Sequence, residues 1–432
     1  MEPKPGDNVE VEAGDEKTKG ILMPSADDNF VVVKLANGYN VGISRKKVKA
    51  VKLIKKHEAK AGKKEGRAAA KNGLPNISIL HLGGTVASKV DYATGGVTAA
   101  FSPDELVSMF PELKDIANIK SRLVRQMMSE NMRFAHYNII AKEIEAEIKA
   151  GADGIIVTHG TDTLHYTSAA LAFILEDLPV PVLLVGAQRS SDRGSSDAAY
   201  NLLSAATFIA SSNFAEVAIC MHKNMEDDLC WILPATKTRK MHTSRRDAFR
   251  PVNTKPFAEV NCRKKQINFL RDDYTQKGDR KLKLKLFNEK IKVGVVKCHT
   301  NMFAEEFEFF RGYDGIVIEG MGLGQIPNTK IDEFSAESEK ILGAVKELAK
   351  KIVVVLAPQT IYGRVNMNVY SEGRKNIEAG ILGDYCDMTP ETAFIKLAWL
   401  LSNYPKEEAK TLFSQSLRRE ISERTEKETF LI

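Results

Sequence analysis

The chain has 432 residues, of which 43% are hydrophobic and 27% charged, with a formal net charge of +6 at pH 7. This length gives room for two or three domains, and the composition is that of a globular protein. No uninterrupted apolar run reaches about 18 residues, which argues against a membrane-spanning helix. The five cysteines are scattered, and the polar N-terminus lacks a signal-peptide pattern. We therefore expect free thiols and a reducing, cytoplasmic location.

The positive charge is concentrated in one segment. Residues 45–71 contain twelve Lys or Arg and two Glu, a net of +10, so the rest of the chain carries −4. One interpretation is a solvated linker, and the other is an electrostatic contact with a polyanion such as RNA. No aromatic residues interleave with these charges, which argues against base stacking.

The first 54 residues predict a small β-barrel of SH3-like size. Short runs rich in Val and Ile alternate there with turn residues, as in small all-β domains. In KLANGYNVGI, Asn37-Gly38 supplies the two turn residues of a tight hairpin. Residues 55–73, rich in Lys, Ala and Gly, are then expected to form a basic linker.

From residue 74 onward, apolar runs such as NISILHLGG, GIIVTHG, PVLLVGA and EVAICM alternate with amphipathic helical patterns. This alternation predicts βαβ units and a parallel sheet covered on both faces. Residues 74–270 are therefore expected to form a large α/β catalytic domain. Near residue 250 the pattern becomes charged and irregular. Residues 291–432 then predict a second, smaller α/β domain.

Hydroxyl and carboxyl groups gather where the predicted strands end. HLGGTVAS places Gly84 and Thr85 after one strand, and THGTDT places Thr161 and Asp162 after another. Sites in parallel α/β sheets lie beyond the carboxyl ends of the strands, so we expect these groups on one rim. A simpler alternative for Asp162 is that it only caps the helix that follows.

Several common kinds of site are absent from the sequence. It contains no GxxxxGK[ST] phosphate loop, no HExxH and no GxSxG elbow, and GMGLG is only a fragment of a dinucleotide fingerprint. His159 and His165, six residues apart, would not share a helix face, which argues against a metal pair. Threonine chemistry remains, and it needs a base or a lysine of lowered pKa. Spacing alone would not have selected Lys240, because a single lysine is usually a surface charge.

Seven motifs carry a resemblance to a known family. In chain order they are NISILHLGGTVAS, MMSENM, GIIVTHGTDTLHYTSAAL, VGAQRSSDRGSSDAAYNL, TRKMHTSRRDAF, GYDGIVIEGMG and GRVNMNVY…MTPETAFIKLAWLL. Together, over roughly residues 74–405, they resemble the L-asparaginase/glutaminase family. That family hydrolyses side-chain amides through a covalent acyl-enzyme on threonine. The resemblance thus implies an asparaginase-like two-block α/β fold behind the small barrel.

The resemblance also implies roles for individual residues. Thr85 is similar to the first nucleophilic threonine of the family, and the second catalytic set corresponds to Thr161, Asp162 and Lys240. Substrate-binding positions correspond to Ser129 and Glu130, which would hold the α-carboxylate and α-amino groups, and to Tyr92, in the place of a flap tyrosine. The resemblance implies no metal site.

Three features depart from a plain asparaginase. Glu130 stands where asparaginases usually carry glutamine, a barrel with a basic linker precedes the catalytic part, and the charged tail LRREISERTEKETFLI follows it. Together these features resemble the D-subunit family of archaeal glutamyl-tRNA(Gln) amidotransferases. This second resemblance implies a glutaminase subunit that hydrolyses L-glutamine and supplies ammonia for converting Glu-tRNA(Gln) to Gln-tRNA(Gln).

The same resemblance implies particular partners. An E-type subunit would bind glutamyl-tRNA(Gln), use ATP and Mg, and receive the ammonia, so this chain would hold no cofactor of its own. The expected assembly is a homodimer of this chain within an α2β2 complex. Two alternatives stay open: a free-standing cytosolic L-asparaginase with an accessory barrel, and an inactive module that contacts RNA through residues 45–71. The sequence does not indicate which threonine attacks first or which route the ammonia takes.

Overall fold

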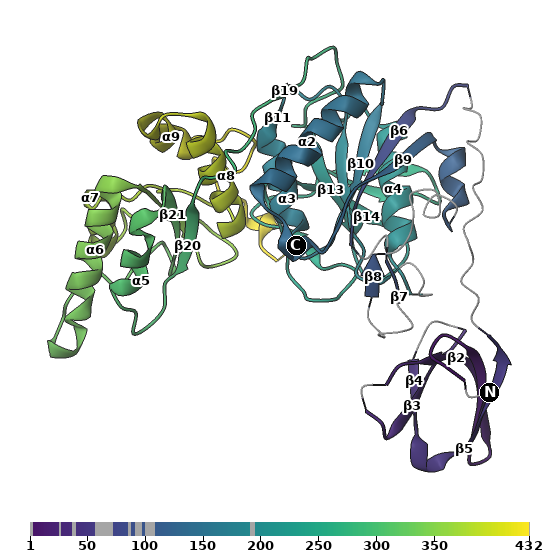
Figure 1. The fold of residues 1–432 in the computed structure, drawn as a ribbon. Coiled ribbons are helices and arrows are strands. Elements are labelled where there is room, and N and C mark those ends of the chain that lie inside the picture. The colour runs from purple at the N-terminus through teal and green to yellow at the C-terminus, as the bar shows by residue number, and fades with distance from the viewer. Residues whose placement is uncertain are drawn as a thin grey trace.

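The computed structural model describes residues 3–25, 27–36, 40–56, 72–84, 109–190 and 195–431, with the backbone of residues 88–90 and 97–99. The described residues form an N-terminal all-β domain, a large α/β domain and a smaller C-terminal α/β domain (Figure 1). No helix in this part of the chain is long and apolar enough to cross a membrane.

The N-terminal domain is one five-stranded antiparallel sheet in the order β4-β3-β2-β1-β5. Its strands are β1 (Asn8–Ala13), β2 (Glu16–Met23), β3 (Phe30–Lys34), β4 (Asn40–Ser44) and β5 (Val48–Lys55). Alternate residues of β1 and β3 form a core of their own, made of Val9, Val11, Val31 and Val33. The predicted hairpin is confirmed by the pairing of β3 with β4, and its turn at Asn37-Gly38 lies outside the described residues.

The basic segment does not begin as a linker. Residues 48–55 form strand β5, which pairs with β1, and Lys52 Nζ lies 2.7 Å from Glu12 Oε1 on that neighbour. The first part of residues 45–71 therefore belongs to the N-terminal domain, which the sequence predicted over the first 54 residues, and is not a solvated linker. Residues 57–71 lie outside the described residues.

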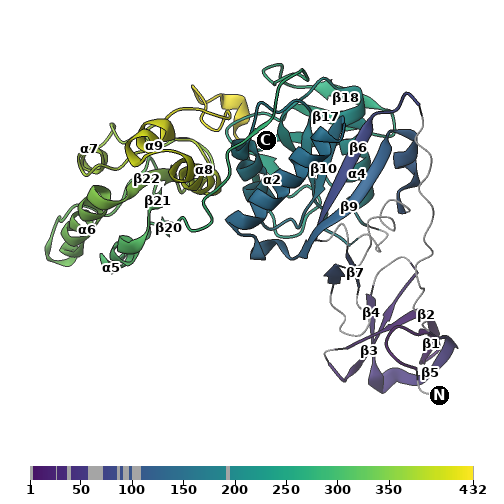
Figure 2. The same ribbon diagram turned by 45° about the horizontal axis from the view of Figure 1, so that its top comes forward.

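The large domain contains an eight-stranded mixed sheet (Figure 2). In spatial order its strands are β18 (Gln266–Phe269), β17 (Ala258–Asn261), β14 (Cys230–Pro234), β13 (Val217–His222), β12 (Val182–Val185), β10 (Gly154–Thr158), β6 (Asn76–Gly83) and β9 (Asn118–Met127). The predicted parallel sheet is confirmed from β9 to β13. The charged stretch near residue 260, expected to be irregular, instead adds β17 and β18 as antiparallel strands, with β18 at the edge of the sheet.

Helices cover both faces of this sheet. Ile155 and Val157 of β10 pack with the helices α2 (Phe134–Lys149) and α3 (Leu164–Ile174). Ile156 points to the other face and packs with α4 (Ala198–Ser211). This alternation follows from the two-residue period of a strand. Short pairs complete the domain: β7 (Ser88–Val90) with β8 (Val97–Ala99), β11 (Leu175–Glu176) with β19 (Lys283–Leu284), and β15 (Thr238–Lys240) with β16 (Phe249–Pro251).

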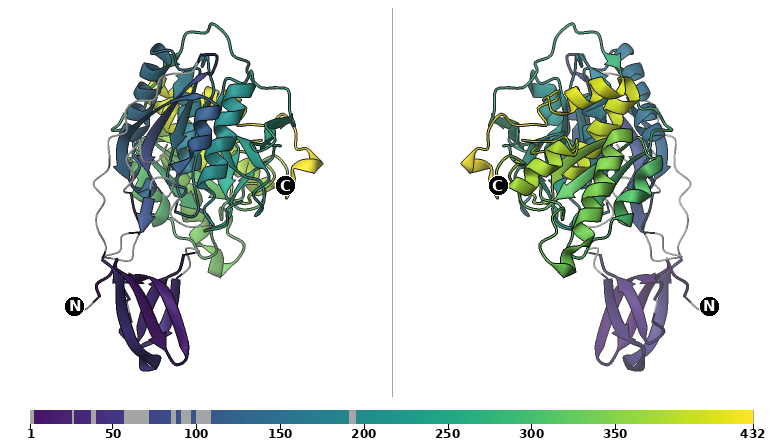
Figure 3. Two further views of the ribbon diagram at one scale, coloured as in Figure 1. Left: turned by 90° about the vertical axis from the view of Figure 1, so that its right-hand side faces the viewer. Right: turned by 90° about the vertical axis from the view of Figure 1, so that its left-hand side faces the viewer.

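The C-terminal domain is built on three parallel strands, β20 (Val293–Lys297), β21 (Gly315–Gly320) and β22 (Val353–Pro358) (Figure 2). In the right-hand view of Figure 3, the green and yellow helices of this domain face the viewer. Its helices are α5 (Glu305–Glu308), α6 (Glu337–Lys351), α7 (Ser371–Glu378), α8 (Pro390–Asn403) and α9 (Lys406–Phe413). Thr389 caps α8 by accepting a hydrogen bond from the Thr392 amide, and Pro390 occupies the first turn. Helix α8 packs against α3, so one hydrophobic core spans both α/β domains.

The charged tail packs back onto the protein. Arg418 reaches the Ala172 carbonyl of α3, and Glu420 forms an ion pair with Lys396 of α8 in which both side chains are fully buried. Phe430 stacks edge-on against Tyr362, with 5.3 Å between ring centroids. Residues 414–431, called the C-terminal segment below, therefore join the two α/β domains.

Candidate active site

Four neighbouring strand ends of the large sheet form one rim. Strands β12, β10, β6 and β9 lie side by side and run parallel. Gly186 follows β12, Thr161 lies in the loop after β10, Gly84 follows β6, and Ser129 follows β9 in a short 3-10 turn. The expectation that these strand ends share an edge agrees with this topology.

Glycines allow the strand ends to approach closely. Gly84 has a φ of +74°, and a Cβ at this position would lie 2.5 Å from the Gly160 amide nitrogen. A Cβ on Gly160 would lie 2.8 Å from Ser129 Oγ, and one on Gly186 would lie 2.8 Å from Thr161 Cγ2. Side chains at these three positions would push the rim apart, so glycine is required there.

Lys240 joins two residues of the GTDT loop. Its Nζ donates to Thr161 Oγ1 at 2.9 Å and lies 2.8 Å from Asp162 Oδ1. The side chain of Lys240 is only 11% exposed, whereas that of Asp162 is 67% exposed, and Thr161 is buried. The two residues that the resemblance grouped with Lys240 therefore both lie within hydrogen-bonding distance of its ammonium group.

Asp162 does not serve as a helix cap. The N-cap of α3 is Thr163, which makes no side-chain capping bond to the helix. Thr163 Oγ1 instead donates to the Ser129 carbonyl at 2.7 Å, which ties the loop after β10 to the turn after β9. The capping alternative is therefore not the arrangement seen here, and the Asp162 carboxylate is directed to Lys240.

Two buried histidines lie near Thr161, and one of them, His159, supports the loop that carries it. His159 Nδ1 lies 2.6 Å from the Gly160 carbonyl, and its Nε2 lies 2.7 Å from Thr167 Oγ1. Because a carbonyl oxygen only accepts, Nδ1 carries the proton and Nε2 accepts from the threonine. Burial lowers the pKa of His159 to about 4, and it does the same for His165 on α3. Both rings are neutral at pH 7, and the bonds of His159 make it a support of the loop.

Asp197 has a supporting role that the sequence did not indicate. It is fully buried, and its Oδ1 accepts from the amides of Gln188 and Arg189 at 3.0 and 3.1 Å. Burial raises the pKa of Asp197, against the effect of these amide bonds. The residue holds the loop after β12, and its motif contains several candidate hydroxyl and carboxyl groups with nothing to distinguish this one.

The remaining predicted site residues fall into two groups. Ser129 is buried beside Gly160, and Glu130 is exposed on the same 3-10 turn. Thr85 and Tyr92 lie outside the described residues. Within the described part of the chain, no group of three His, Cys, Asp or Glu side chains could hold a metal ion.

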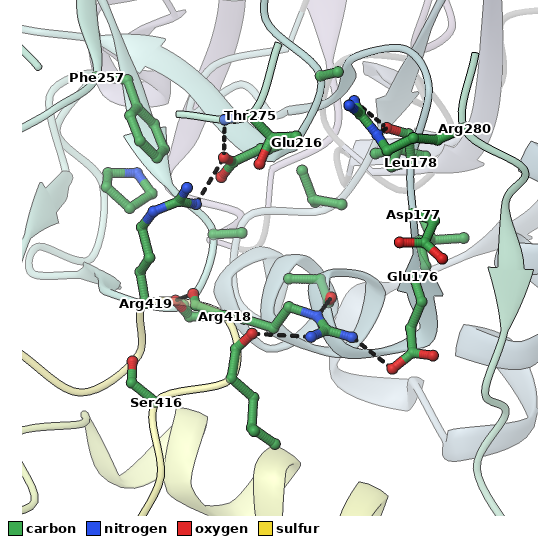
Figure 4. A pocket seen from close by; sticks show the side chains of 18 of the residues that line it. Glu176, Asp177, Leu178, Glu216, Phe257, Thr275, Arg280, Ser416, Arg418 and Arg419 are labelled. Atoms are coloured by element: carbon green, nitrogen blue, oxygen red, sulfur yellow. Dashed lines mark hydrogen bonds and ion pairs between the residues drawn. The ribbon is translucent and has the colours of Figure 1, made fainter. Parts of the chain in front are cut away.

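Two cavities differ in their relation to these residues. One of about 280 Å³ is lined by Asp162, Lys240 and residues 241–243. A larger one, of about 560 Å³, lies at the C-terminal end of α3 and is bordered by the C-terminal segment (Figure 4). Arg418 and Arg419 on its wall already pair with Glu176 and Glu216. The smaller cavity is lined by two of the predicted catalytic residues, Asp162 and Lys240, so we place the candidate active site there.

Comparisons with known proteins agree with this arrangement. Three families match in succession: GatD N-terminal domain over residues 3–54, Asparaginase, N-terminal over residues 76–274, and Glutaminase/Asparaginase C-terminal domain over residues 292–413. The D-subunit of glutamyl-tRNA(Gln) amidotransferase from Methanococcus maripaludis is 43% identical over 424 residues, which are 97% of this chain and 98% of that protein. The chain belongs to this D-subunit family of amidotransferases.

A second relative and a solved structure are consistent with this assignment. The amidotransferase D-subunit of Thermococcus kodakarensis is 42% identical over 99% of this chain and 96% of that protein. The solved L-asparaginase of the same organism is 28% identical, with a TM-score of 0.69, and matches 81% of this chain and 100% of that one. The family thus shares the asparaginase-like fold and adds the N-terminal domain, as the sequence predicted.

Proposed function

We propose that this chain is the glutaminase subunit of a tRNA-dependent amidotransferase. It hydrolyses the side-chain amide of L-glutamine, and the ammonia serves to convert Glu-tRNA(Gln) to Gln-tRNA(Gln) on a partner subunit. The observation that carries the proposal is the position of Lys240 Nζ, which reaches both Thr161 Oγ1 and Asp162 Oδ1. A lysine between a hydroxyl and a carboxylate can take or return a proton as the hydroxyl or a water attacks.

The chemistry divides among a few residues. Thr85 attacks the amide carbon, ammonia leaves, and water then cleaves the acyl-enzyme, while Thr161, Lys240 and Asp162 move the protons. Ser129 and Glu130 bind the α-carboxylate and α-ammonium groups of the substrate, and Asp162, the most exposed member of the set, also faces the ammonium. Tyr92 assists Thr85. The tight glycine contacts at the rim support a preorganised site.

The alternative is a free-standing L-asparaginase. One organism, Thermococcus kodakarensis, has both an amidotransferase D-subunit and an L-asparaginase, so the two can be compared directly. This chain matches the former at 42% identity over nearly the full length, and it matches the asparaginase at 28% identity over 81% of its residues. This difference favours the amidotransferase component.

The proposed assembly places the remaining chemistry elsewhere. An E-type partner binds glutamyl-tRNA(Gln) and carries out the ATP- and Mg-dependent step. Two copies of this chain form a homodimer within an α2β2 complex. This chain requires no cofactor of its own for amide hydrolysis, because its proton transfers use side chains.

Ammonia release by the purified chain tests the proposal. It is measured from L-glutamine and from L-asparagine, each with and without the E-type subunit and glutamyl-tRNA(Gln). We expect weak hydrolysis of glutamine by the chain alone and a rise when partner and charged tRNA are present. Vigorous hydrolysis of asparagine that ignores the partner would instead identify an asparaginase.

A further inference from the structure

Lys240 lies at the end of a very short strand. β15 has three residues and pairs only with β16, in a two-stranded ribbon separate from the eight-stranded sheet. An isolated two-stranded ribbon has little stability of its own in water. The position of Lys240 Nζ must therefore depend on other contacts of this segment.

Those contacts come from the opposite face of the strand. Side chains alternate along a strand, so Arg239 points away from Thr161 while Lys240 points toward it, and Lys237 lies in the bend that leads into the strand. Lys237 Nζ lies 2.7 Å from Asp387 Oδ2 and 2.8 Å from Ser422 Oγ. Arg239 Nη2 lies 3.0 Å from Glu391 Oε1 on α8. Every one of these partners belongs to the small domain or the C-terminal segment.

The ion pairs are sheltered from water. The Lys237 and Asp387 side chains are 3% and 1% exposed, and that of Glu391 is 11% exposed. Glu391 Oε2 is buried and accepts no hydrogen bond from a described residue, so Arg239 is the main compensation for this carboxylate. Charges removed from water are costly unless paired, which fixes the strand against α8.

Thr236, which precedes Lys237 and β15, is held by the C-terminal segment. Thr236 Oγ1 donates to the Arg418 carbonyl at 3.0 Å, and its own carbonyl accepts from Thr392 Oγ1 at 2.9 Å. Arg418 and Arg419 extend in different directions, to Glu176 and Glu216 of the large domain (Figure 4). Residues 236–239 are thus bound both to α8 and to the C-terminal segment.

We propose that Lys237 and Arg239 are positioning residues that set Lys240 Nζ against Thr161 by docking its strand on the small domain and the C-terminal segment. Neither residue touches the proposed substrate. The inference rests on the proposed glutaminase function, and it adds a way in which a partner subunit could regulate glutamine hydrolysis. A partner subunit that shifts residues 386–422 moves the catalytic lysine without entering the active site.

The test is an Arg239→Gln variant of the full-length chain, assayed for ammonia release from L-glutamine. A displacement of about 1 Å at a reacting group can cost about 100-fold in rate, so we expect kcat to fall at least about tenfold. KM should stay within about twofold, because substrate contacts are unchanged. Arg239→Lys, which keeps the charge, should return kcat to within about threefold of the wild type.

A matched control is Arg122→Gln. Arg122 forms an ion pair with Glu147 at 2.9 Å, with side chains 33% and 5% exposed, against 30% and 11% for Arg239 and Glu391. This pair links β9 to α2 and makes no contact with β15. Arg122 also pairs with Glu143, and Glu147 keeps Lys120 and Ser78 as partners. Loss of the Arg122 side chain should lower thermal stability and leave kcat unchanged, which separates a stability effect from a positioning effect.

Three outcomes overturn the inference. They are an unchanged kcat in Arg239→Gln, an equal loss in Arg122→Gln, and a crystal structure of Arg239→Gln in which Lys240 Nζ still lies about 2.9 Å from Thr161 Oγ1. The crystal structure decides the matter even if no variant is active. A wild-type chain that releases no ammonia would overturn the proposed function instead, and so separates the two claims.

Discussion

At the scale of single residues, Lys240 is the group on which the site depends. Its ammonium links a buried threonine hydroxyl to an exposed carboxylate. A methionine of similar length fills the same space and neither donates nor accepts the proton. The lysine's contribution to proton transfer can thus be separated from its contribution to packing.

We expect Lys240→Met and Thr161→Val each to lower kcat for glutamine hydrolysis by roughly 1,000-fold or more, as is usual for groups that act together in one catalytic unit. Ammonia release measures the effect, and thermal unfolding checks the fold. The double variant should lose no more than either single one. Additive losses would mean that the two residues act independently.

A substitution at Gly160 should weaken substrate binding rather than proton transfer. A Cβ at this position would lie 2.8 Å from both Cβ and Oγ of Ser129. Gly160→Ala should displace Ser129 and raise KM for glutamine about tenfold or more, because a carboxylate that loses a hydrogen bond to a buried hydroxyl loses about 1.5–3 kcal/mol. Steady-state kinetics measure this.

The control for Gly160 is Gly343→Ala in α6, where an added Cβ meets nothing within 4 Å. Alanine is the better helix former, so this variant should be slightly more stable and keep its KM. An unchanged KM in Gly160→Ala would remove Ser129 from substrate binding.

The sequence predicted part of this chemistry and missed the rest. The family resemblance grouped Thr161, Asp162 and Lys240, and the structure brings these three side chains together; spacing alone would not have selected Lys240. The motifs did not identify Asp197, whose role depends on amides eight and nine residues away meeting a buried carboxylate. Nor did they identify Arg239. In the sequence, an arginine beside a lysine is typical of an exposed surface, and only the fold shows that Glu391 of α8 lies against it.

At the scale of elements, the packing of the C-terminal segment is the feature that the sequence least revealed. Charged residues usually indicate a solvated tail, and the alternation of charge in LRREISERTEKETFLI has no helical or strand period. Several of these charges instead meet partners on other elements, which no local pattern encodes. Strands β17 and β18 were missed for the same reason: the turn between them is charged, and their pairing depends on contacts that the local sequence pattern does not encode.

Glu420 is the element's most sensitive position. Its carboxylate accepts from the Leu417 and Arg418 amides and pairs with Lys396, and both side chains of the pair are fully buried. Glu420→Gln leaves Lys396 as an uncompensated buried charge and should lower the free energy of unfolding by about 3–5 kcal/mol. Urea denaturation at pH 7 measures this change.

Glu407→Gln is the matched control, because Glu407 pairs with Lys410 on the surface and is 79% exposed. It should unfold at the same urea concentration as the wild type. Equal behaviour of the two variants would show that the C-terminal segment contributes little to stability.

At the scale of the whole molecule, three buried histidines predict how stability varies with pH. Burial lowers the pKa of His81, His159 and His165 from 6.5 to about 4. The unfolded chain binds these protons below about pH 6.5 and the folded chain does not, so stability is present above that value and is lost as pH falls toward 4. Each histidine contributes up to about 1.4 kcal/mol per pH unit in this window.

Free energies of unfolding measured at pH 7, 6 and 5 test this linkage. His81→Gln retains groups that can bond to Thr158 and Ser121, the present partners of the ring, and removes one titrating site. Its slope below pH 6 should be smaller by about 1.4 kcal/mol per pH unit. A flat curve for the wild type between pH 6.5 and 5 would show that these rings are protonated in the folded chain.

The contacts of the C-terminal segment also bear on the order of events during synthesis. Residues 236–239 are bound by residues 387–422, and Asp387 is synthesised 150 residues after Lys237. A growing chain therefore holds every catalytic side chain long before it holds them in place. We expect a ribosome-stalled chain that ends before residue 387 to release no ammonia, so that glutamine is spared until the small domain has formed.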